Sequence, residues 1–240
     1  NFTDEPDVVR PRYYCVPDPR CGRIKTLFLS EGEHSNPQTT HQLLYDTVNR
    51  KTSVFDIEDQ RTDYHWNEAF RLEKINHYNS QGILLRTEQF RWTNLGNLIC
   101  TSLLDSKGVP LRAKRYIYDS LGNMLEERTF GNLSGKGTSL GLDSQGFPIE
   151  NGVESFGKRF TYHTEKISLL CSEEDDCGKR IEYSYLSNTN RLNSQLFYDQ
   201  QELKQRKFWN YNFDGLLLSE IIDNGSSPDP HDFTGVSLRL

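Results

Sequence analysis

The chain has 240 residues, a formal net charge of −6 at pH 7, 35% hydrophobic residues and 12% aromatic residues. The acidic balance offers no basic surface for nucleic acid or for an anionic membrane, and no apolar run approaches the roughly 20 residues of a membrane span. Because each buried aromatic ring removes about 150–250 Å² from water, this composition favours a thin sheet covered by rings over a thick two-layer core.

Residues 1–44 differ in composition from the rest of the chain. Proline is confined to sheet edges and loops, so this segment is predicted to be an extended lead-in with one strand, Arg23 to Leu29. The chain starts at Asn1 without the basic and apolar segments of a secretion signal, which is expected of a processed product or an excised fragment. The prolines of the segment are Pro6, Pro11, Pro17, Pro19 and Pro37.

From residue 45 to 223 the chain repeats one short pattern, in which an aromatic residue precedes a short polar residue and a glycine follows three residues later. Asp or Asn can accept hydrogen bonds from nearby backbone amides, and Gly takes a positive φ without a Cβ clash. Each copy therefore predicts a chain reversal. The repeat-turn residues are Tyr45, Asp46, Trp66, Asn67, Tyr78, Asn79, Gly82, Trp92, Gly96, Asp105, Gly108, Tyr118, Asp119, Gly122, Asp143, Gly146, Tyr198, Asp199, Tyr211, Asn212 and Gly215, with weaker copies at Tyr162-His163 and Tyr185-Leu186.

The spacing of the copies predicts short strands between the turns. From residue 66 to 118 the steps are 12, 14, 12 and 14, and from 185 to 211 they are 13 and 13. About five residues of each step form the turn, which leaves roughly six to eight for a strand. The intervening residues, such as Met124 to Phe130, suit a pleated surface. We predict an all-β antiparallel meander, with loops inserted in the longer steps from 45 to 66 and from 118 to 185.

Three segments depart from the regular repeat. Residues 131–157 are rich in Gly, Ser and Asn and are predicted to form a surface loop. Residues 193–208 contain good helix formers, but the copy at Tyr198-Asp199 interrupts them, so strands are favoured over a helix. Residues 224–240 are predicted to be an irregular tail that ends in a truncated strand, Val236 to Leu240.

The five cysteines leave two interpretations open. Cys15 and Cys21 are six residues apart, and so are Cys171 and Cys177. Two local disulfides would suit an extracellular protein, whereas the odd count, with Cys100 alone, suits reduced and buried thiols. The spacing does not decide between them.

Four short motifs resemble sites of chemistry, and each has a simpler structural explanation. Gly137-Thr138-Ser139-Leu140-Gly141 matches a nucleophile elbow, which needs a strand before it and a helix after it, but it lies in the glycine-rich loop. Residues 131–137 lack the glycine spacing and the hydroxyl residue of a phosphate-binding loop. Residues 210–221 begin like a calcium loop without its final glutamate, and the acidic run Glu173 to Asp176 is typical of a solvated hairpin tip.

The remaining candidate groups also favour a structural role. The six histidines never fall four residues apart, which removes the helical zinc motif. The rings that recur at strand ends are expected to seal neighbouring strands against each other, in preference to forming a stacking platform for sugars or bases. We therefore predict a non-enzymatic chain with no catalytic residue, no cofactor and no metal site.

The repeated Tyr-Asp-x-x-Gly-x-Leu units resemble the YD repeats of the Rhs family, which includes Rhs polymorphic toxins, the shell-forming components of Tc toxins, and teneurins. The resemblance covers about residues 45–223. It implies a curved, spiralling β-sheet that forms part of a hollow shell, often around a toxic C-terminal polypeptide. The matching units are Tyr118-Asp119…Gly122…Leu125, Tyr78-Asn79…Gly82…Leu84 and Tyr211-Asn212…Gly215…Leu217.

By the same resemblance, the chain is expected to be one wall segment of a larger Rhs-like protein that is secreted or exposed at the cell surface. The Asp-Pro-rich motif that ends many such shells is not matched by Pro228-Asp229-Pro230, so a toxin domain would lie outside these residues. The expected partners are the remainder of the parent chain and that C-terminal toxin domain, with no nucleic acid and no membrane span.

Two further expectations complete the interpretation. The exposed first and last strands of the sheet favour edge-to-edge self-association. The alternative function is a cell-surface adhesin, which would present Trp66, Trp92 or the 131–157 loop to a glycan or a protein partner.

Overall fold

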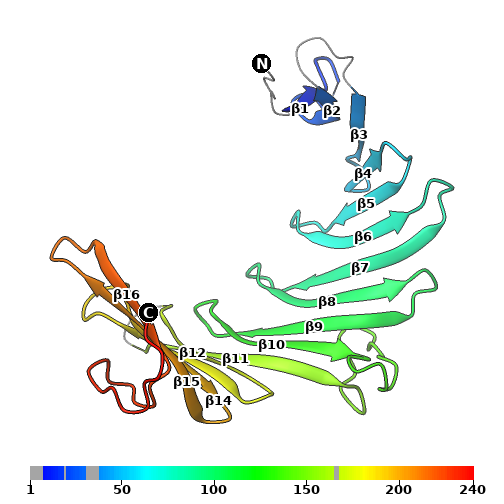
Figure 1. Cartoon of the computed structure of the whole chain (residues 1–240). Helices are drawn as coiled ribbons and strands as arrows, with labels where there is room; N and C mark the ends of the chain where they lie inside the picture. Colours follow the sequence, from blue (N-terminus) through cyan, green and yellow to red (C-terminus); the bar gives the residue numbers. More distant parts are fainter. Residues whose placement is uncertain (1–7, 19, 31–37, 165–167) are drawn as a thin grey trace, which may run out of the picture. The chain divides into compact units, whose positions relative to one another are not determined.

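The computed structural model describes residues 8–18, 20–30, 38–164 and 168–240 (Figure 1). Within these ranges the chain forms strands and turns and contains no helix. Several residues used in the sequence analysis, namely Asn1, Pro6, Pro19, His34 and Pro37, lie outside the described residues.

The described residues form the following strands: β1 (Val8–Tyr13), β2 (Ile24–Ser30), β3 (Gln38–Asp46), β4 (Lys51–Asp56), β5 (Arg61–Trp66), β6 (Leu72–Tyr78), β7 (Leu84–Trp92), β8 (Leu98–Asp105), β9 (Pro110–Tyr118), β10 (Met124–Gly131), β11 (Ser155–Tyr162), β12 (Leu170–Asp175), β13 (Lys179–Tyr185), β14 (Leu192–Asp199), β15 (Glu202–Tyr211) and β16 (Leu217–Asp223).

The strands follow one another across a single sheet. Each described strand is hydrogen-bonded to the next one along the chain, from β1 to β16, and the successive ribbons can be followed in Figure 1. The predicted all-β antiparallel meander is confirmed. Residues 193–208 belong to β14 and β15 and not to a helix, because the strand pairing outweighs the helix propensity of a few residues.

The chain divides into two compact units. Unit 1 holds the described residues up to Ala113 together with Ser139–Ile149, and unit 2 holds Lys114–Thr138 and Glu150–Leu240. Unit 1 therefore contains β1 to β8, and unit 2 contains β10 to β16 and the tail. The Ser139–Ile149 segment is a short hairpin with a bridge between Leu142 and Pro148.

The strands leave an unusually large area open to water. The chain exposes 16033 Å², whereas a compact monomer of this size exposes about 11,000 Å² and two separate compact halves about 13,000 Å². The fully buried hydrophobic side chains among the described residues are Tyr14, Cys100, Leu104, Ala113, Phe130, Leu140, Leu196 and Phe208.

Residues 1–44 hold more strands than predicted. Besides β2, which matches the expected strand, the segment contains β1 and most of β3. Among the described strands β1 pairs only with β2, so Pro11 lies on an edge strand, where proline is tolerated. The proline content was therefore not a sign of a mostly strandless lead-in.

Two of the longer repeat steps contain extra strands where loops were predicted. The step from 45 to 66 contains β4 and a turn at Asp56, and the step from 162 to 185 contains β12 and a turn at Asp175. The turn at Asp56 escaped the pattern because Asp59 stands where glycine is expected, and the turn at Asp175 because Glu174 replaces the aromatic residue.

The inserted loop is real but shorter than predicted. β10 ends at Gly131 and β11 begins at Ser155, so Ser155 to Gly157 belong to the sheet. Gly157 pairs with Arg128 of β10. A glycine that signalled a loop is in fact a strand residue with a packing role, which is described below.

Candidate functional site

The repeat turns are closed by one hydrogen-bond pattern. The backbone N–H of Asp119 donates to the Asn123 carbonyl at 2.9 Å, and the N–H of Gly122 donates to the Asp119 carbonyl at 3.2 Å. The Asp119 carboxylate accepts the N–H groups of Leu121 at 2.9 Å and Asn123 at 2.8 Å. The side-chain amide of Asn123 and these N–H groups lower the pKa of Asp119. The turn therefore stabilises the ionised carboxylate.

The same arrangement recurs in both units. Each turn leaves its fourth residue with a positive φ, which is glycine in most copies, although Asp59 (φ 58°) and Phe70 (φ 56°) occupy this position in two of them. The other turns with this pattern begin at Asp56, Asn67, Asn79, Thr93, Asp105, Asp143, Asp175 and Asn212.

Two of the predicted turns have a different geometry. The Asp46 carboxylate accepts the backbone N–H and the side-chain amide of Asn49, at 2.9 and 2.7 Å. Asp199 pairs with Glu202, which leaves a two-residue loop whose residues both have positive φ, 48° and 74°. That combination is a type I′ hairpin turn, so Tyr198-Asp199 is a strand end next to it.

Aromatic residues at strand ends bind the preceding strand. Trp92, Tyr162 and Tyr185 each end a strand, and each donates a hydrogen bond to the carbonyl of the first residue of the strand before it. Burial raises the pKa of Tyr162 and of Tyr185, so both hydroxyls remain neutral donors. The acceptors are, in the same order, Leu72 at 2.6 Å, Met124 at 2.9 Å and Leu170 at 2.9 Å.

Arginines stack on rings at the strand ends, a feature that the sequence analysis missed. Each arginine stands at or just before the start of one strand and covers the aromatic residue near the end of the next. Such a contact contributes about 0.5–1 kcal/mol at an exposed site. The pairs are Arg23 with Tyr45 (5.1 Å to the ring centre), Arg61 with Tyr78 (4.0 Å), Arg180 with Tyr198 (4.6 Å) and Arg191 with Tyr211 (6.0 Å).

A fully buried ion pair joins β15 to β16. The side chains of Arg206 and Asp223 are both 0% exposed, and Nε of Arg206 donates to the Asp223 carboxylate. Nη2 also donates to the Asp223 carboxylate at 3.3 Å, and the other donors reach the tail: Nη1 binds the carbonyls of Ser227 and, at 2.8 Å, Asp229, and Nη2 binds the carbonyl of Asp232 at 2.7 Å. Every N–H of this guanidinium therefore has an acceptor.

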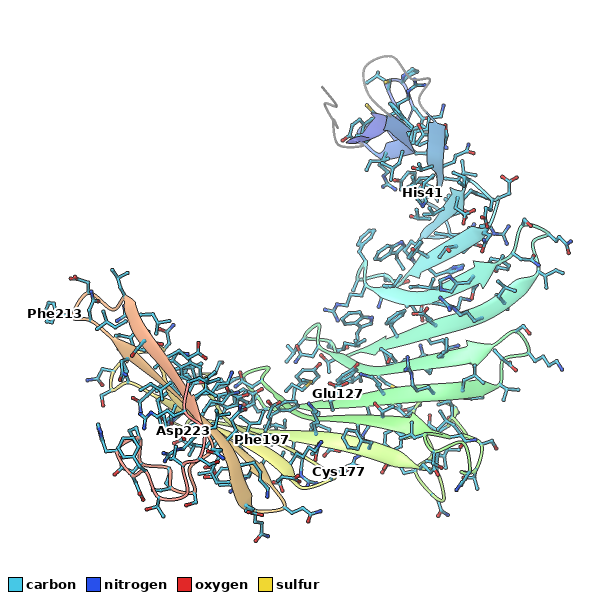
Figure 2. All side chains as sticks on the ribbon, viewed as in Figure 1. His41, Glu127, Cys177, Phe197, Phe213 and Asp223 are labelled. Carbon is cyan, nitrogen blue, oxygen red and sulfur yellow. The ribbon has the colours of Figure 1, made fainter. Side chains whose placement is uncertain are left out.

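The ion pair fixes the start of the tail, where Figure 2 shows Asp223. Burial by itself raises the pKa of Asp223, but Arg206 and the N–H of Gly225 at 3.0 Å outweigh it, so the pKa is lowered. At the other end of the tail, Leu240 exchanges two backbone hydrogen bonds with Ile222, at 3.1 and 2.8 Å. The strand expected over Val236–Leu240 is reduced to a bridge at Arg239.

A second charged cluster crosses β11 at Gly157, a residue without a side chain. Arg128 of β10 reaches over Gly157 of β11 and donates to the Asp176 carboxylate at 2.7 Å, which also accepts the Gly157 N–H at 2.8 Å. A Cβ on Gly157 would lie 2.7 Å from the guanidinium carbon of Arg128. The acidic run therefore is not a freely solvated tip: Asp176 binds this arginine, and Glu173 accepts the Tyr183 hydroxyl at 2.8 Å.

The motifs that resembled sites of chemistry lack the surroundings that such chemistry needs. Ser139 is exposed in an irregular segment, without the helix that a nucleophile elbow requires. The Asn212 amide oxygen of the calcium-like segment accepts the N–H of Leu216 at 2.8 Å within its turn. In the described part of the chain, no three His, Cys, Asp or Glu side chains gather as a metal site, and no helix is long and apolar enough to cross a membrane.

The structure excludes one of the two possible disulfides, the one between Cys171 and Cys177. All five cysteines are free. Cys171 lies near the start of β12 and Cys177 lies beyond its end, so about four strand residues at roughly 3.3 Å each separate them, well beyond the roughly 7 Å Cα limit of a disulfide. Cys15 and Cys21 are both exposed in the turn between β1 and β2.

Hollows line one edge of unit 1, where β3, β5 and β7 end. Trp66 contributes to two of them and Trp92 to a third, of about 320 Å³. The largest of the three encloses about 560 Å³, and it is lined by Arg23, Tyr45, Asp46, Thr47, Arg50, Lys51, Thr52, Trp66 and Phe70.

Comparisons with known proteins find similarity in fold. No protein-family model matches the chain, and no curated protein matches it in sequence. A chain in the crystal structure of TcdB2-TccC3-Cdc42 is 17% identical, with a TM-score of 0.53 over 91% of this chain and 12% of that one. A chain in the structure of the Photorhabdus luminescens Tc holotoxin pore is 15% identical, with a TM-score of 0.53 over 92% of this chain and 12% of that one.

Proposed function

We propose that this chain is a non-enzymatic wall segment of a larger Rhs-type, YD-repeat protein. The observation that carries the proposal is the chain-order meander, in which side-chain-capped turns recur and which shares its fold with components of Tc toxins over 91% of its length. The repeat units at Tyr78, Tyr118 and Tyr211 support the same family independently of overall identity.

The exposed surface of the chain fits a wall. A sheet without a covering layer leaves both faces and its edges in water, and the excess over a compact protein exceeds about 2,000 Å² even if the halves are counted separately. A parent shell would cover one face and continue the edges into neighbouring strands. We place the parent outside the cell or on its surface, with a C-terminal toxin domain as the enclosed partner.

In the proposed role, the repeat residues stabilise the sheet. The Asp and Asn side chains of the turns accept backbone N–H groups, the end-of-strand rings bind neighbouring carbonyls, and the arginines cover those rings. These groups are therefore engaged in holding strands together. A curved wall needs such fixed turns because each turn sets the register of the next strand.

The test is to label opposite faces of the sheet in the parent protein. Leu85 and Arg86 are adjacent in β7 and both exposed, and adjacent strand residues point to opposite faces. In a closed shell, a bulky maleimide should modify only one of the variants Leu85→Cys and Arg86→Cys, whereas the isolated chain should react at both. Equal labelling of the two variants in the full-length product, measured as added mass relative to the unsubstituted protein, would rule out a closed wall.

A binding module for a glycan or a protein partner is the second candidate. The hollows at Trp66 and Trp92 favour it, since a plain wall needs none. Loss of glycan binding on Trp66→Ala, with the circular dichroism spectrum unchanged, would support an adhesin.

A further inference from the structure

Phe70 has a backbone conformation that its side chain does not favour. It occupies the fourth position of the turn that begins at Asn67, with φ 56°, where equivalent turns carry glycines such as Gly82 and Gly122. A bulky residue in this region is an outlier whose backbone is strained. The ring gains no burial in return, because Phe70 is 78% exposed. The fold alone therefore does not explain this residue.

The Phe70 ring lines the 560 Å³ hollow of unit 1. Tyr45 at the end of β3 and Trp66 at the end of β5 supply two further rings. A hollow of this size lies within the roughly 300–1,000 Å³ range of ligand sites, and rings of this kind are the side chains that dominate binding hot spots. The hollow can thus receive an apolar side chain from a partner.

Cations surround these rings in a chain that is acidic overall. Arg23, Arg50 and Lys51 line the hollow, and Asp46 is its only acidic lining residue. The carboxylate of Asp46 is already bonded to Asn49, at 2.9 and 2.7 Å. Arg50 pairs with Glu68 at 3.6 Å and Lys51 with Asp63 at 3.8 Å, yet their side chains remain 41% and 33% exposed and can reach a further carboxylate. The charge of the hollow is complementary to carboxylates.

We propose that this hollow binds an acidic polypeptide segment through one apolar anchor residue. The anchor would contact Tyr45, Trp66 and Phe70, and flanking Asp or Glu side chains would pair with Arg23, Arg50 and Lys51. A polypeptide fits better than a neutral sugar, because the carboxylate that would accept sugar hydroxyls is occupied by Asn49. The proposal goes beyond the wall role and does not depend on it.

The experiment uses the whole chain and a short fluorescein-labelled peptide in which aspartates flank a single phenylalanine. Binding is followed by fluorescence anisotropy at two salt concentrations. We expect saturable binding that weakens as salt screens the ion pairs, and weaker binding still when the phenylalanine of the peptide is replaced by alanine or its aspartates by lysines.

The decisive variant is Phe70→Gly. Glycine takes φ 56° without strain, so the thermal midpoint should stay the same or rise, while peptide affinity should fall at least about tenfold, as for a hot-spot residue. Phe213→Gly is the control, because Phe213 is even more exposed than Phe70, at a turn tip of unit 2 (Figure 2), and lines none of these hollows. Arg50→Gln should weaken binding and reduce its salt dependence.

Three results would overturn the proposal. The first is no binding of the aspartate peptide, and the second is equal affinity of the unsubstituted chain and Phe70→Gly. The third is binding of the acidic polysaccharide alginate without binding of the peptide, which would assign the hollow to glycans. None of these results bears on face-selective labelling of the parent, so failure here is separable from failure of the wall proposal.

Discussion

At the scale of single residues, two glycines that the sequence analysis assigned to a turn and to a loop have different structural roles. Gly122 supplies the positive φ (87°) of a repeat turn. Gly157 lies inside β11 and leaves room for the Arg128 side chain to reach Asp176. The same residue type thus provides backbone freedom at one position and empty volume at the other.

The volume argument predicts that Gly157→Ala destabilises unit 2. The added methyl group would displace the Arg128 guanidinium from the Asp176 carboxylate, and the loss of such a partly exposed ion pair costs about 0.2–1 kcal/mol. Gly141→Ala is the control, since its Cβ would meet Ile149 at an ordinary 3.4 Å and the residue has no positive φ. Urea unfolding followed by circular dichroism measures both; equal midpoints for the two variants would contradict the prediction.

The lowered pKa of Asp223 predicts a sensitivity to acid. A carboxylate with a lower pKa in the folded state stabilises the fold above its unfolded pKa, about 3.9, and that contribution is lost as the pH falls further through the folded pKa. We expect the thermal midpoint of the unsubstituted chain to drop in this range. Asp223→Asn should already be less stable at pH 7 and should show a smaller drop; a parallel drop in both would refute the assignment.

At the scale of elements, the tail depends on one guanidinium. Arg206 binds Asp223 and three tail carbonyls, so the tail is held by a side chain of β15 and by the pairing of Leu240 with Ile222. An irregular segment therefore gains a defined position without becoming a strand.

Removing this guanidinium is predicted to be costly. Arg206→Met removes the hydrogen-bonded partner of the buried Asp223 and leaves it only Arg239, at 3.7 Å; breaking a buried pair in this way costs about 3–5 kcal/mol. Adding Asp223→Leu should recover part of the loss, because the buried charge is then gone, but the tail should stay open to proteolysis since its carbonyls still lack donors.

Lys204→Met is the matched control for this series. Lys204 lies on the same strand and is 44% exposed in its pair with Glu202, so its loss should cost about 0–1 kcal/mol. For each of these variants, the denaturant midpoint measures stability and limited proteolysis measures protection of the tail. A double variant with a fully protected tail would show that the arginine does not anchor it.

Turns and strands were predictable from sequence to the extent that they are local. Asp119 bonds amides two and four residues ahead, and so its pattern is visible in any single copy. Arg128 and Asp176 are 48 residues apart, and only the register of β10, β11 and β12 brings them together. The turn at Asp56 was missed for a different reason, since Asp59 takes the position of the expected glycine.

At the scale of the whole molecule, the order of the strands leaves two outer edges in the described sheet, at β1 and at β16. The pairing of Leu240 with Ile222 covers part of β16. Unpaired N–H and C=O groups on the remaining edge residues are templates for another chain.

We therefore predict that the isolated chain self-associates as its concentration rises. Arg206→Met, which loosens the tail over β16, should associate at lower concentration than Lys204→Met. Multi-angle light scattering across a dilution series measures this. A concentration-independent monomer for all variants would contradict the prediction.

Because every described strand is bonded to its neighbours in the chain, no backbone pairing between strands has to wait for a distant part of the polypeptide. Proteins rich in such short-range contacts fold fast, and a ribosome releases residues at about 5–20 per second. Each hairpin can thus be completed shortly after its second strand leaves the exit tunnel. The newest strand then serves as the template for the one still being translated, so the sheet grows in the direction of synthesis.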